Sequence, residues 1–359
     1  MNITFFIGGL SGGGAERVTC NLANYMMEKG HQVEILTMAD DTPSYPLSKD
    51  IKRRVLLRDD ERKSFFYNSI LRLYRFFKFL RHTESEVVVV MLPVTTIMLL
   101  QLKWLTKAKV IAAERSLPSI YTQKEQKQLL RLAPKADGWV FQTEGQKDWY
   151  VARGLKKCAV IPNAINPAFL NEEYLGERNK DIVTVGSLTV PKNHELLISS
   201  FAKIADKYKD FRLVIYGKGV KLDILQRLAE ELGVDDRVVF AGYSTNVSKS
   251  IKASALFVLS SNYEGMPNAL MEAMALGIPC VSTDCDGGGA RFLVENEKNG
   301  LLVPKGDADA LAAAMERMLS NHDFAEQCGR EAHKICERLA PEKIYGEWEQ
   351  FIREVVDKQ

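Results

Sequence analysis

Short apolar runs alternate with segments of helical periodicity along nearly the whole chain. The first half contains five runs rich in branched residues, at positions 3–7, 33–38, 87–91, 109–113 and 138–142. A second set of five follows a polar interval, at 181–185, 211–216, 238–241, 255–260 and 279–283. Such runs, separated by amphipathic helices, are typical of parallel strands that are covered on both faces. The pattern therefore predicts an α/β protein with two Rossmann-like domains facing each other across a cleft.

Turn-forming and charged residues separate the two sets of strands. Positions 161–167 read Ile-Pro-Asn-Ala-Ile-Asn-Pro, and 171–180 is polar. A chain of 359 residues also suits two domains of about 150 residues each. We expect an N-terminal domain over 1–165, a C-terminal domain over 178–340, and a final helix within 341–359 that packs back on the N-terminal domain. Ligands of open parallel sheets bind at the carboxyl ends of strands, so the site is expected in those loops.

Composition narrows the class of protein. With 46% apolar and 26% charged residues, the chain resembles a soluble globular protein. Its six cysteines include no C-x-x-C pair, which argues against zinc and thioredoxin-like sites. No signal peptide is recognisable, and no apolar stretch reaches the roughly 18 residues of a transmembrane helix. These features predict a cytoplasmic protein.

Positive charge is concentrated in one segment. Between positions 52 and 81, ten Lys and Arg residues stand against three acidic residues, whereas the whole chain has a net charge of +2. On a helical wheel of about 100° per residue, one apolar arc of 64–81 is expected to face the core. That arc comprises Phe66, Ile70, Leu73, Phe77 and Leu80.

The other side of this predicted helix mixes cations with large apolar residues. The cations are Arg72, Arg75, Lys78 and Arg81, and they are interleaved with Phe65, Tyr67, Leu71, Tyr74 and Phe79. This mixture favours a surface that lies on anionic lipid, with Arg72, Arg75 and Lys78 as the contacts. A packed helix whose cations only serve solubility is the alternative. No nucleic-acid motif accompanies the charge, so no nucleic-acid partner is expected.

The segment from Glu264 to Glu272 carries the most specific chemistry. It reads Glu-Gly-Met-Pro-Asn-Ala-Leu-Met-Glu and follows a predicted strand. Pro267 suits the first turn of a helix and Gly277 the position just past its end. Free N–H groups near 266–269 can then bind an anion or a hydroxyl oxygen. Two carboxylates held one or two turns apart suit the hydroxyls of a ribose and of a transferred sugar.

Two further loops follow predicted strands. In Gly186-Ser-Leu-Thr-Val-Pro-Lys192-Asn193, Lys192 supplies the cation that a phosphate site needs. Near the N-terminus, Gly12-Gly-Gly-Ala-Glu-Arg17 lets the backbone approach a ligand and opens a helix. A dinucleotide-binding fingerprint would need a glycine at the position of Arg17, so this loop does not match that motif.

Together these strings resemble glycosyltransferase family 4, whose members are retaining enzymes of the GT-B fold. The resemblance implies that Glu272 binds the ribose of the nucleotide and that Glu264 contacts the donor sugar near the reacting carbon. It further implies front-face attack, in which the donor phosphate helps to take the proton of the acceptor. The family usually places an Arg and a Lys on the diphosphate, whereas this chain has Ser187 in place of the Arg.

The same resemblance extends to other loops. It implies that Gly14 faces the donor phosphate and that Glu16 and Arg17 lie on the acceptor side. Arg115 replaces a histidine that relatives often have near the donor sugar, and it could hold a phosphate instead. The full set of expected donor-binding residues is Gly14, Ser187, Lys192, Asn193, Gly217, Tyr243, Gly265, Met266, Pro267, Asn268, Ala269 and Glu272, with Glu264 and Arg115 as catalytic residues.

We therefore expect a hexose or N-acetylhexosamine, with GalNAc favoured, to move from a UDP-sugar to a polyprenyl-diphosphate-linked or other surface glycan. The enzyme would be peripheral on the inner face of the cell membrane. The motif combination most resembles bacterial GalNAc transferases of lipid-linked oligosaccharides. The alternatives are a UDP-sugar 2-epimerase of the same fold and a non-catalytic nucleotide-sugar-binding protein. Asp284-Cys-Asp286 matches a metal motif of other glycosyltransferases, but we expect no metal or other cofactor.

Overall fold

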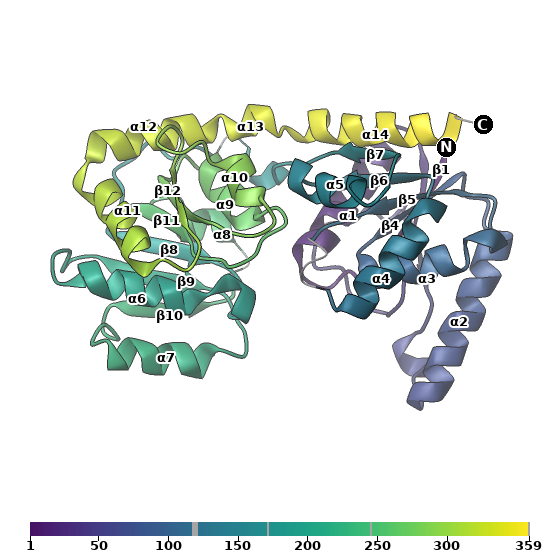
Figure 1. Cartoon of the computed structure of the whole chain (residues 1–359), viewed down its shortest axis with the longest axis horizontal. Coiled ribbons are helices and arrows are strands. Elements are labelled where there is room, and N and C mark those ends of the chain that lie inside the picture. The colour runs from purple at the N-terminus through teal and green to yellow at the C-terminus, as the bar shows by residue number, and fades with distance from the viewer. Residues whose placement is uncertain (117–120, 171, 245, 358–359) are drawn as a thin grey trace. The chain divides into compact units, whose positions relative to one another are not determined.

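The computed structural model describes residues 1–116, 121–170, 172–244 and 246–357 (Figure 1). It divides into two compact units. Unit 1 comprises Met1–Asn163 and Glu342–Gln359, and unit 2 comprises Ala164–Pro341. Residue 171, where the predicted polar linker begins, and residues 358 and 359 of the predicted C-terminal segment lie outside the described residues. Each unit contains a parallel sheet with helices on both faces, which confirms the predicted fold class.

The sheet of unit 1 has the strand order β3-β2-β1-β4-β5-β6-β7. Its strands are β1 (Asn2–Ile7), β2 (Gln32–Thr37), β3 (Lys52–Val55), β4 (Val87–Met91), β5 (Lys109–Ala113), β6 (Gly138–Phe141) and β7 (Cys158–Val160). The central strand β4 is buried throughout. The edge strands β3 and β7 were not predicted, because β3 reads Lys-Arg-Arg-Val and β7 has three residues. An edge position allows a strand to be polar or short.

Helices cover both faces of this sheet. They are α1 (Gly14–Glu28), α2 (Phe65–His82), α3 (Pro93–Gln101), α4 (Gln123–Leu132), α5 (Glu144–Val151) and α14 (Pro341–Asp357). The C-terminal helix α14 packs within unit 1 through one apolar face, on which Tyr345 and Trp348 are buried. The ring of Tyr345 lies 5.3 Å from that of Tyr25 in α1.

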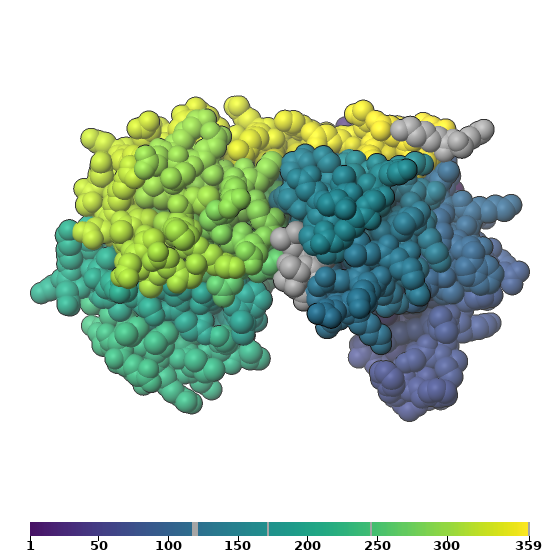
Figure 2. Space-filling view, viewed as in Figure 1, coloured from purple at the N-terminus to yellow at the C-terminus, as the bar shows by residue number. Residues whose placement is uncertain are grey.

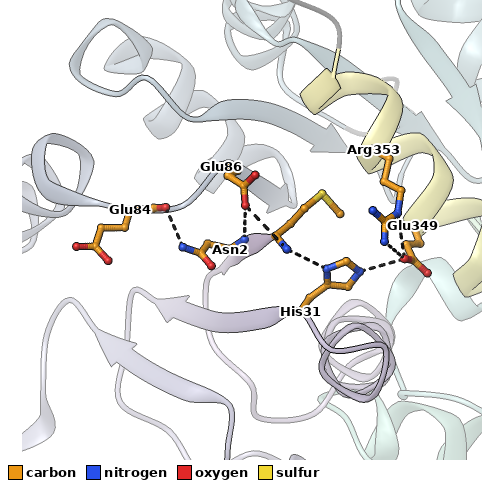
Figure 3. A network of polar contacts seen from close by, with 7 residues as sticks. Asn2, His31, Glu84, Glu86, Glu349 and Arg353 are labelled. Atoms are coloured by element: carbon orange, nitrogen blue, oxygen red, sulfur yellow. Dashed lines mark hydrogen bonds and ion pairs between the residues drawn. The ribbon is translucent and has the colours of Figure 1, made fainter.

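Polar contacts also fasten α14 to unit 1 (Figure 3). Glu349 of α14 lies 3.1 Å from Nε2 of His31, in the turn between α1 and β2, and also accepts from Arg353. The other ring nitrogen of His31 lies 3.3 Å from the N-terminal amino group. Burial raises the pKa of Glu349, but the hydrogen bonds from Arg353 and His31 outweigh it and leave that pKa below its ordinary value.

The sheet of unit 2 has the order β10-β9-β8-β11-β12-β13. Its strands are β8 (Asp181–Val185), β9 (Arg212–Tyr216), β10 (Val238–Gly242), β11 (Leu256–Leu259), β12 (Cys280–Asp284) and β13 (Leu301–Pro304). Its helices are α6 (His194–Ala205), α7 (Leu222–Glu231), α8 (Val247–Ile251), α9 (Asn268–Ala275), α10 (Gly289–Leu293), α11 (Ala308–Ser320), α12 (His322–His333) and α13 (Ile335–Arg338). Phe201 and Ile215 lie in its buried core. The change of strand order between β8 and β11 brings loops that are distant in sequence to one edge of the sheet.

Helix α2 differs from the prediction. Its buried residues are Phe76, Phe79 and Leu80, all in the second half. The first half extends away from the rest of unit 1, as Figure 2 shows for the purple-blue atoms at the lower right. Phe66 is 74% exposed and Ile70 52% exposed. Of the predicted core arc, Leu80 is buried as expected, but Phe66, Ile70 and Leu73 are exposed, because only the second half of the helix lies against the domain. Phe79, which was expected on the opposite side, is buried as well. Among the described residues, no helix has the length and apolarity that crossing a membrane requires.

Candidate active site

A Lys–Glu ion pair lies at the carboxyl edge of the unit 2 sheet. Lys192 Nζ is 2.5 Å from Glu264 Oε1. Lys192 ends a short 3-10 turn (Val190–Lys192) in the loop that follows β8, and Glu264 lies in the loop that follows β11. Because β8 and β11 pair in parallel, these loops meet although the two residues are 72 positions apart. The Lys192 side chain is 25% exposed and that of Glu264 10% exposed, so the pair lies partly within reach of a ligand.

The glycine run after β12 fixes the loop of Glu264. The backbone N–H of Glu264 donates to the carbonyl of Asp286 at 2.9 Å. Gly287 has a φ of +108°, and a Cβ there would lie 1.7 Å from the Glu264 carbonyl oxygen. A Cβ on Gly289 would similarly lie 2.1 Å from the oxygen of Gly265. Glycine is required here because backbone approaches backbone directly.

Helix α9 begins immediately after this loop. Pro267 precedes its first residue, Asn268, and Gly277 follows its end with a φ of +68°. The prediction that Gly277 stands just past the helix end is thus confirmed, and its backbone is left-handed there. Glu272 is buried in the second turn, on the same helix that opens beside Glu264. Gly265, Met266 and Pro267 are buried as well, whereas Asn268 and Ala269 are half-buried.

The segment around Lys192 contains a buried histidine that sequence reasoning missed. Asn193 adopts a left-handed φ of +47° and caps α6, and its Nδ2 donates to Asn262 at 3.0 Å. The next residue, His194, is 2% exposed, with Nε2 3.2 Å from the Ser187 carbonyl oxygen. Burial, followed by the charge of Lys192, lowers the pKa of His194 to about 4 despite hydrogen bonds that favour the protonated ring. A neutral His194 does not replace the positive charge that Ser187 lacks.

Two more predicted donor residues follow β9 and β10. Gly217 N donates to the carbonyl of Gly242 at 2.8 Å, and a Cβ on Gly217 would lie 1.8 Å from the oxygen of Gly186. The glycine loops after β8, β9 and β10 therefore adjoin one another. Tyr243, directly after β10, is 67% exposed, which leaves its ring open to a ligand.

In unit 1, the predicted glycine loop leads into α1 and is held by an aspartate that was not predicted. Asp41 Oδ2 accepts from the backbone N–H groups of Leu10 at 2.6 Å and Ser11 at 2.7 Å. The two adjacent aspartates after the second predicted strand, Asp40 and Asp41, were the available signal. A Cβ on Gly13 would lie 2.1 Å from Glu16 Oε2, so Glu16 folds back over this loop. Burial, assisted by the charge of Asp41, raises the pKa of Glu16.

The other predicted unit 1 residues have different surroundings. Gly14 is the first residue of α1, and the guanidinium of Arg17 lies 6.0 Å from the ring centre of Tyr45. Arg115, just after β5, is buried and donates to Asn163 Oδ1 at 3.0 Å. It also lies 5.6 Å from the ring centre of Trp348. Burial lowers the pKa of Arg115 to about 10, so the group remains charged at neutral pH.

The predicted membrane cations are not equivalent. Arg75 makes two hydrogen bonds to the carboxylate of Glu61, at 2.5 and 2.6 Å. The bonded guanidinium lowers the pKa of Glu61 to about 2. Lys78 is exposed, whereas Arg72 is partly buried. The role of Arg75 stays a prediction, but its guanidinium is already paired with a carboxylate within the protein.

The acidic pair of the possible metal motif is occupied by cations. Asp284 bonds to Arg291, and Asp286 bonds to Lys305 at 2.7 Å. Within the described ranges, no cluster of three or more His, Cys, Asp or Glu side chains could hold a metal ion.

Two family models match the chain, one for each set of strands. The model of "Glycosyltransferase Family 4" matches residues 12–169, and that of "Glycosyl transferases group 1" matches residues 168–335. An undecaprenol-linked glycan α-1,4-N-acetyl-D-galactosaminyltransferase of Campylobacter jejuni is 27% identical over 365 residues, covering 99% of each chain.

Other similarities are less complete or more distant. An exopolysaccharide phosphotransferase of Streptomyces coelicolor is 32% identical over 64% of this chain, but the match spans only 25% of that protein. The crystal structure of HepE from Anabaena with UDP superposes with a TM-score of 0.83 at 16% identity, covering 99% of this chain and 100% of that one. This last likeness concerns the fold alone. The matched models, the relatives and the two parallel sheets together show that the chain belongs to the family 4 glycosyltransferases of the GT-B fold and is a hexosyltransferase.

Proposed function

We propose that the enzyme transfers a hexose or N-acetylhexosamine, with GalNAc favoured, from a UDP-sugar to a polyprenyl-diphosphate-linked glycan, and that it retains the anomeric configuration. The observation that carries this proposal is the ion pair between Lys192 and Glu264 at the carboxyl edge of the unit 2 sheet. It places a cation for a diphosphate beside a carboxylate for a sugar hydroxyl. The Campylobacter relative, which matches along its whole length, supports the choice of GalNAc and of a lipid-linked acceptor.

The chemistry follows from how a donor would redistribute this pair. A diphosphate competes with Glu264 for Lys192, and the more highly charged anion wins because Coulomb attraction scales with charge. Glu264 is then released to accept a hydrogen bond from a hydroxyl of the donor sugar. The backbone N–H groups at the start of α9 favour the same anion. In our proposal Glu272 binds the ribose, Tyr243 and Gly217 adjoin the base, and a donor phosphate oxygen takes the proton of the attacking acceptor.

The choice of donor is tested by turnover of several sugar nucleotides. Purified enzyme would be given UDP-GalNAc, UDP-GlcNAc, UDP-glucose and GDP-mannose with a polyprenyl-diphosphate-linked acceptor, and nucleotide release would be followed. We expect UDP release that depends on the acceptor and is fastest with UDP-GalNAc, and an α-linked product by NMR. Acceptor-independent conversion of the UDP-sugar to its epimer would favour the 2-epimerase. Binding of UDP without any turnover would favour a non-catalytic protein.

We also propose that the first half of α2 docks the enzyme on the inner face of the cell membrane. Its exposed apolar side chains are Phe65, Phe66, Tyr67, Ile70, Leu73 and Tyr74. A cluster of this kind on one short segment is typical of an interaction surface rather than of a solvated helix. Apolar insertion, with Lys78 near anionic headgroups, accounts for both kinds of residue. Arg75 contributes less than the sequence indicates, because Glu61 neutralises it.

Vesicle sedimentation separates the apolar from the electrostatic contribution. We expect serine at Phe65, Phe66 and Ile70 to release the enzyme from phosphatidylglycerol vesicles, and glutamate at Arg72, Arg75 and Lys78 to weaken binding less. A matched control replaces Val220, Leu222 and Ile224 with serine, since these are exposed apolar residues of unit 2. Equal sedimentation of the wild type and both α2 variants would contradict the membrane proposal.

A further inference from the structure

Two adjacent serines at the end of β11 contact the two charged residues of the site from inside the protein. Ser260 and Ser261 follow directly after Leu259, and both are buried. The Ser261 hydroxyl donates to Glu264 Oε1 at 2.7 Å. The Ser260 hydroxyl donates to the backbone carbonyl oxygen of Lys192 at 3.1 Å. One strand end thus holds both members of the ion pair.

Ser261 is itself fixed by the neighbouring strand. Thr283 of β12 donates its hydroxyl to the Ser261 carbonyl oxygen at 2.6 Å. All three groups, Thr283, Ser261 and Glu264, are buried, and buried polar groups that are bonded in series hold one another in a single arrangement. The orientation of the Glu264 carboxylate is therefore set by the sheet and not only by its own loop.

The hydroxyls of Ser260 and Ser261 are expected to act differently when a diphosphate binds Lys192 and takes it away from Glu264. Glu264 Oε1 accepts from both Lys192 and Ser261, so Ser261 still holds the carboxylate after Lys192 leaves it. A hydrogen bond to a charged group is stronger than a neutral one. Ser260 acts on the main chain of Lys192, so it fixes where that side chain starts but leaves its ammonium free to turn toward a phosphate.

We propose that Ser260 and Ser261 are positioning residues of the donor site, with Ser261 orienting Glu264 for the transfer step and Ser260 placing Lys192 for diphosphate binding. This inference rests on the proposed function of the Lys192–Glu264 pair. Neither serine touches the substrate, because both are buried behind the charged residues. Their effects on turnover should therefore pass through Glu264 and Lys192 respectively, and should divide between kcat and donor affinity.

The experiment compares Ser260→Ala and Ser261→Ala with Ser200→Ala, using UDP binding by calorimetry and UDP-GalNAc turnover. Ser200 is a matched control, because it is equally buried and its hydroxyl donates to carbonyl oxygens of Leu196 and Ala308, away from the ion pair. We expect Ser261→Ala to lower kcat about tenfold with little change in UDP affinity, as loss of a hydrogen bond to a charged group implies. Ser260→Ala should weaken UDP binding about fivefold with kcat nearly unchanged.

Substitutions that keep either the hydroxyl or only the size of Ser261 distinguish a positioning role from a packing role. Ser261→Thr keeps the hydroxyl and should recover most of kcat, whereas Ser261→Cys keeps the size but is a weak donor and should behave like Ser261→Ala. If Ser261→Ala folds poorly, the comparison of Thr with Cys at wild-type melting temperature decides the question. Wild-type kcat in Ser261→Ala together with wild-type UDP affinity in Ser260→Ala, or losses equal to those of Ser200→Ala, would overturn the inference while leaving the proposed function intact. A wild type that neither binds UDP nor turns over UDP-GalNAc would overturn both.

Discussion

The two units contain the same kind of sheet but treat the charged groups at their strand ends differently. In unit 2, Lys192 and Glu264 face each other at a partly exposed position. In unit 1, Glu114 and Arg115 are buried. Glu114 accepts from the hydroxyls of Tyr121 and Tyr150, both at 2.7 Å, and Arg115 is bonded to Asn163.

This difference indicates different tasks for the two sheets. A charged pair that is only partly desolvated can exchange its partner for a charged ligand at little cost. A buried charge bonded by neutral side chains would lose those bonds and gain a ligand only by rearrangement. This difference supports our proposal that unit 2 binds the anionic donor. In the same proposal, the glycine loop under Glu16 and the exposed apolar half of α2 in unit 1 serve an acceptor that arrives with lipid.

The largest effect should come from removing the unit 2 cation. Lys192→Met is expected to lower kcat/KM about 100- to 1000-fold, because it deletes the charge that we propose binds the diphosphate. Lys180→Met is the matched control, since Lys180 pairs with Asp210 before the start of β8, at the opposite edge of the sheet. UDP release measured with both variants, at equal melting temperature, checks this expectation. Equal activity of the two variants would contradict it.

Because the Glu264 loop packs directly against the glycine run after β12, adding one methyl group to that run should lower stability considerably. Gly287→Ala should lower the free energy of unfolding by about 3–4 kcal/mol, because its Cβ meets the Glu264 carbonyl and its φ is strained. Gly288→Ala shares a positive φ but has open space around its Cβ, so about 1–2 kcal/mol is expected. Urea unfolding of both variants measures the difference. Equal losses would mean that the close approach of the two loops is unimportant.

Arg115 tests the contrasting claim about unit 1. Arg115→Met should lower the free energy of unfolding by about 2–3 kcal/mol, since a charged hydrogen bond to Asn163 is lost. Arg131→Met, on the exposed face of α4, should be neutral. If Arg115 also holds a phosphate in place of the histidine contact of relatives, turnover will fall beyond what the loss of folded protein explains. If Arg115→Met lowers turnover while the free energy of unfolding stays at the wild-type value, Arg115 acts on a ligand and not on the fold. The contrast between the buried charges of unit 1 and the partly exposed ion pair of unit 2 would then not hold.

A smaller effect on folding stability is expected when acid protonates His194. Its pKa of about 4 in the folded protein lies below the ordinary value of 6.5, so the unfolded chain binds the proton more tightly. The stability that depends on neutral His194 is complete above pH 6.5 and is lost as the pH falls toward 4. As the pH is lowered from 6.5 to 4, the melting temperature of His194→Gln should fall less than that of the wild type. His322→Gln, at a mostly exposed position, should follow the wild type.

Much of the fold could be predicted, because buried parallel strands have a strong apolar signal. Strands 87–91, 109–113 and 181–185 were predicted to the residue. The edge strand β3 was missed since its Lys and Arg side chains are solvated. The core face of α2 was predicted correctly only at Leu80, because periodicity cannot tell which part of a helix lies against the domain.

The site could be predicted only as separate motifs. Lys192 and Glu264 each follow a predicted strand, but their contact depends on β8 and β11 being neighbours, and strand order is not written in local sequence. Ser260 and Ser261 carried no signal, since a serine at a strand end has many uses. Asp41 was not predicted, because only the structure shows that its carboxylate turns toward the glycine loop.

The most direct test of the account is UDP release by Glu264→Gln beside the wild type, with the donor saturating and the acceptor present. Gln keeps the size of the side chain and removes the negative charge that faces Lys192 and, in our proposal, the donor sugar. We expect a loss of kcat of about 100-fold or more, with UDP binding retained and the melting temperature close to that of the wild type. A variant that retains wild-type kcat would show that the Lys192–Glu264 pair is not the centre of the transfer reaction.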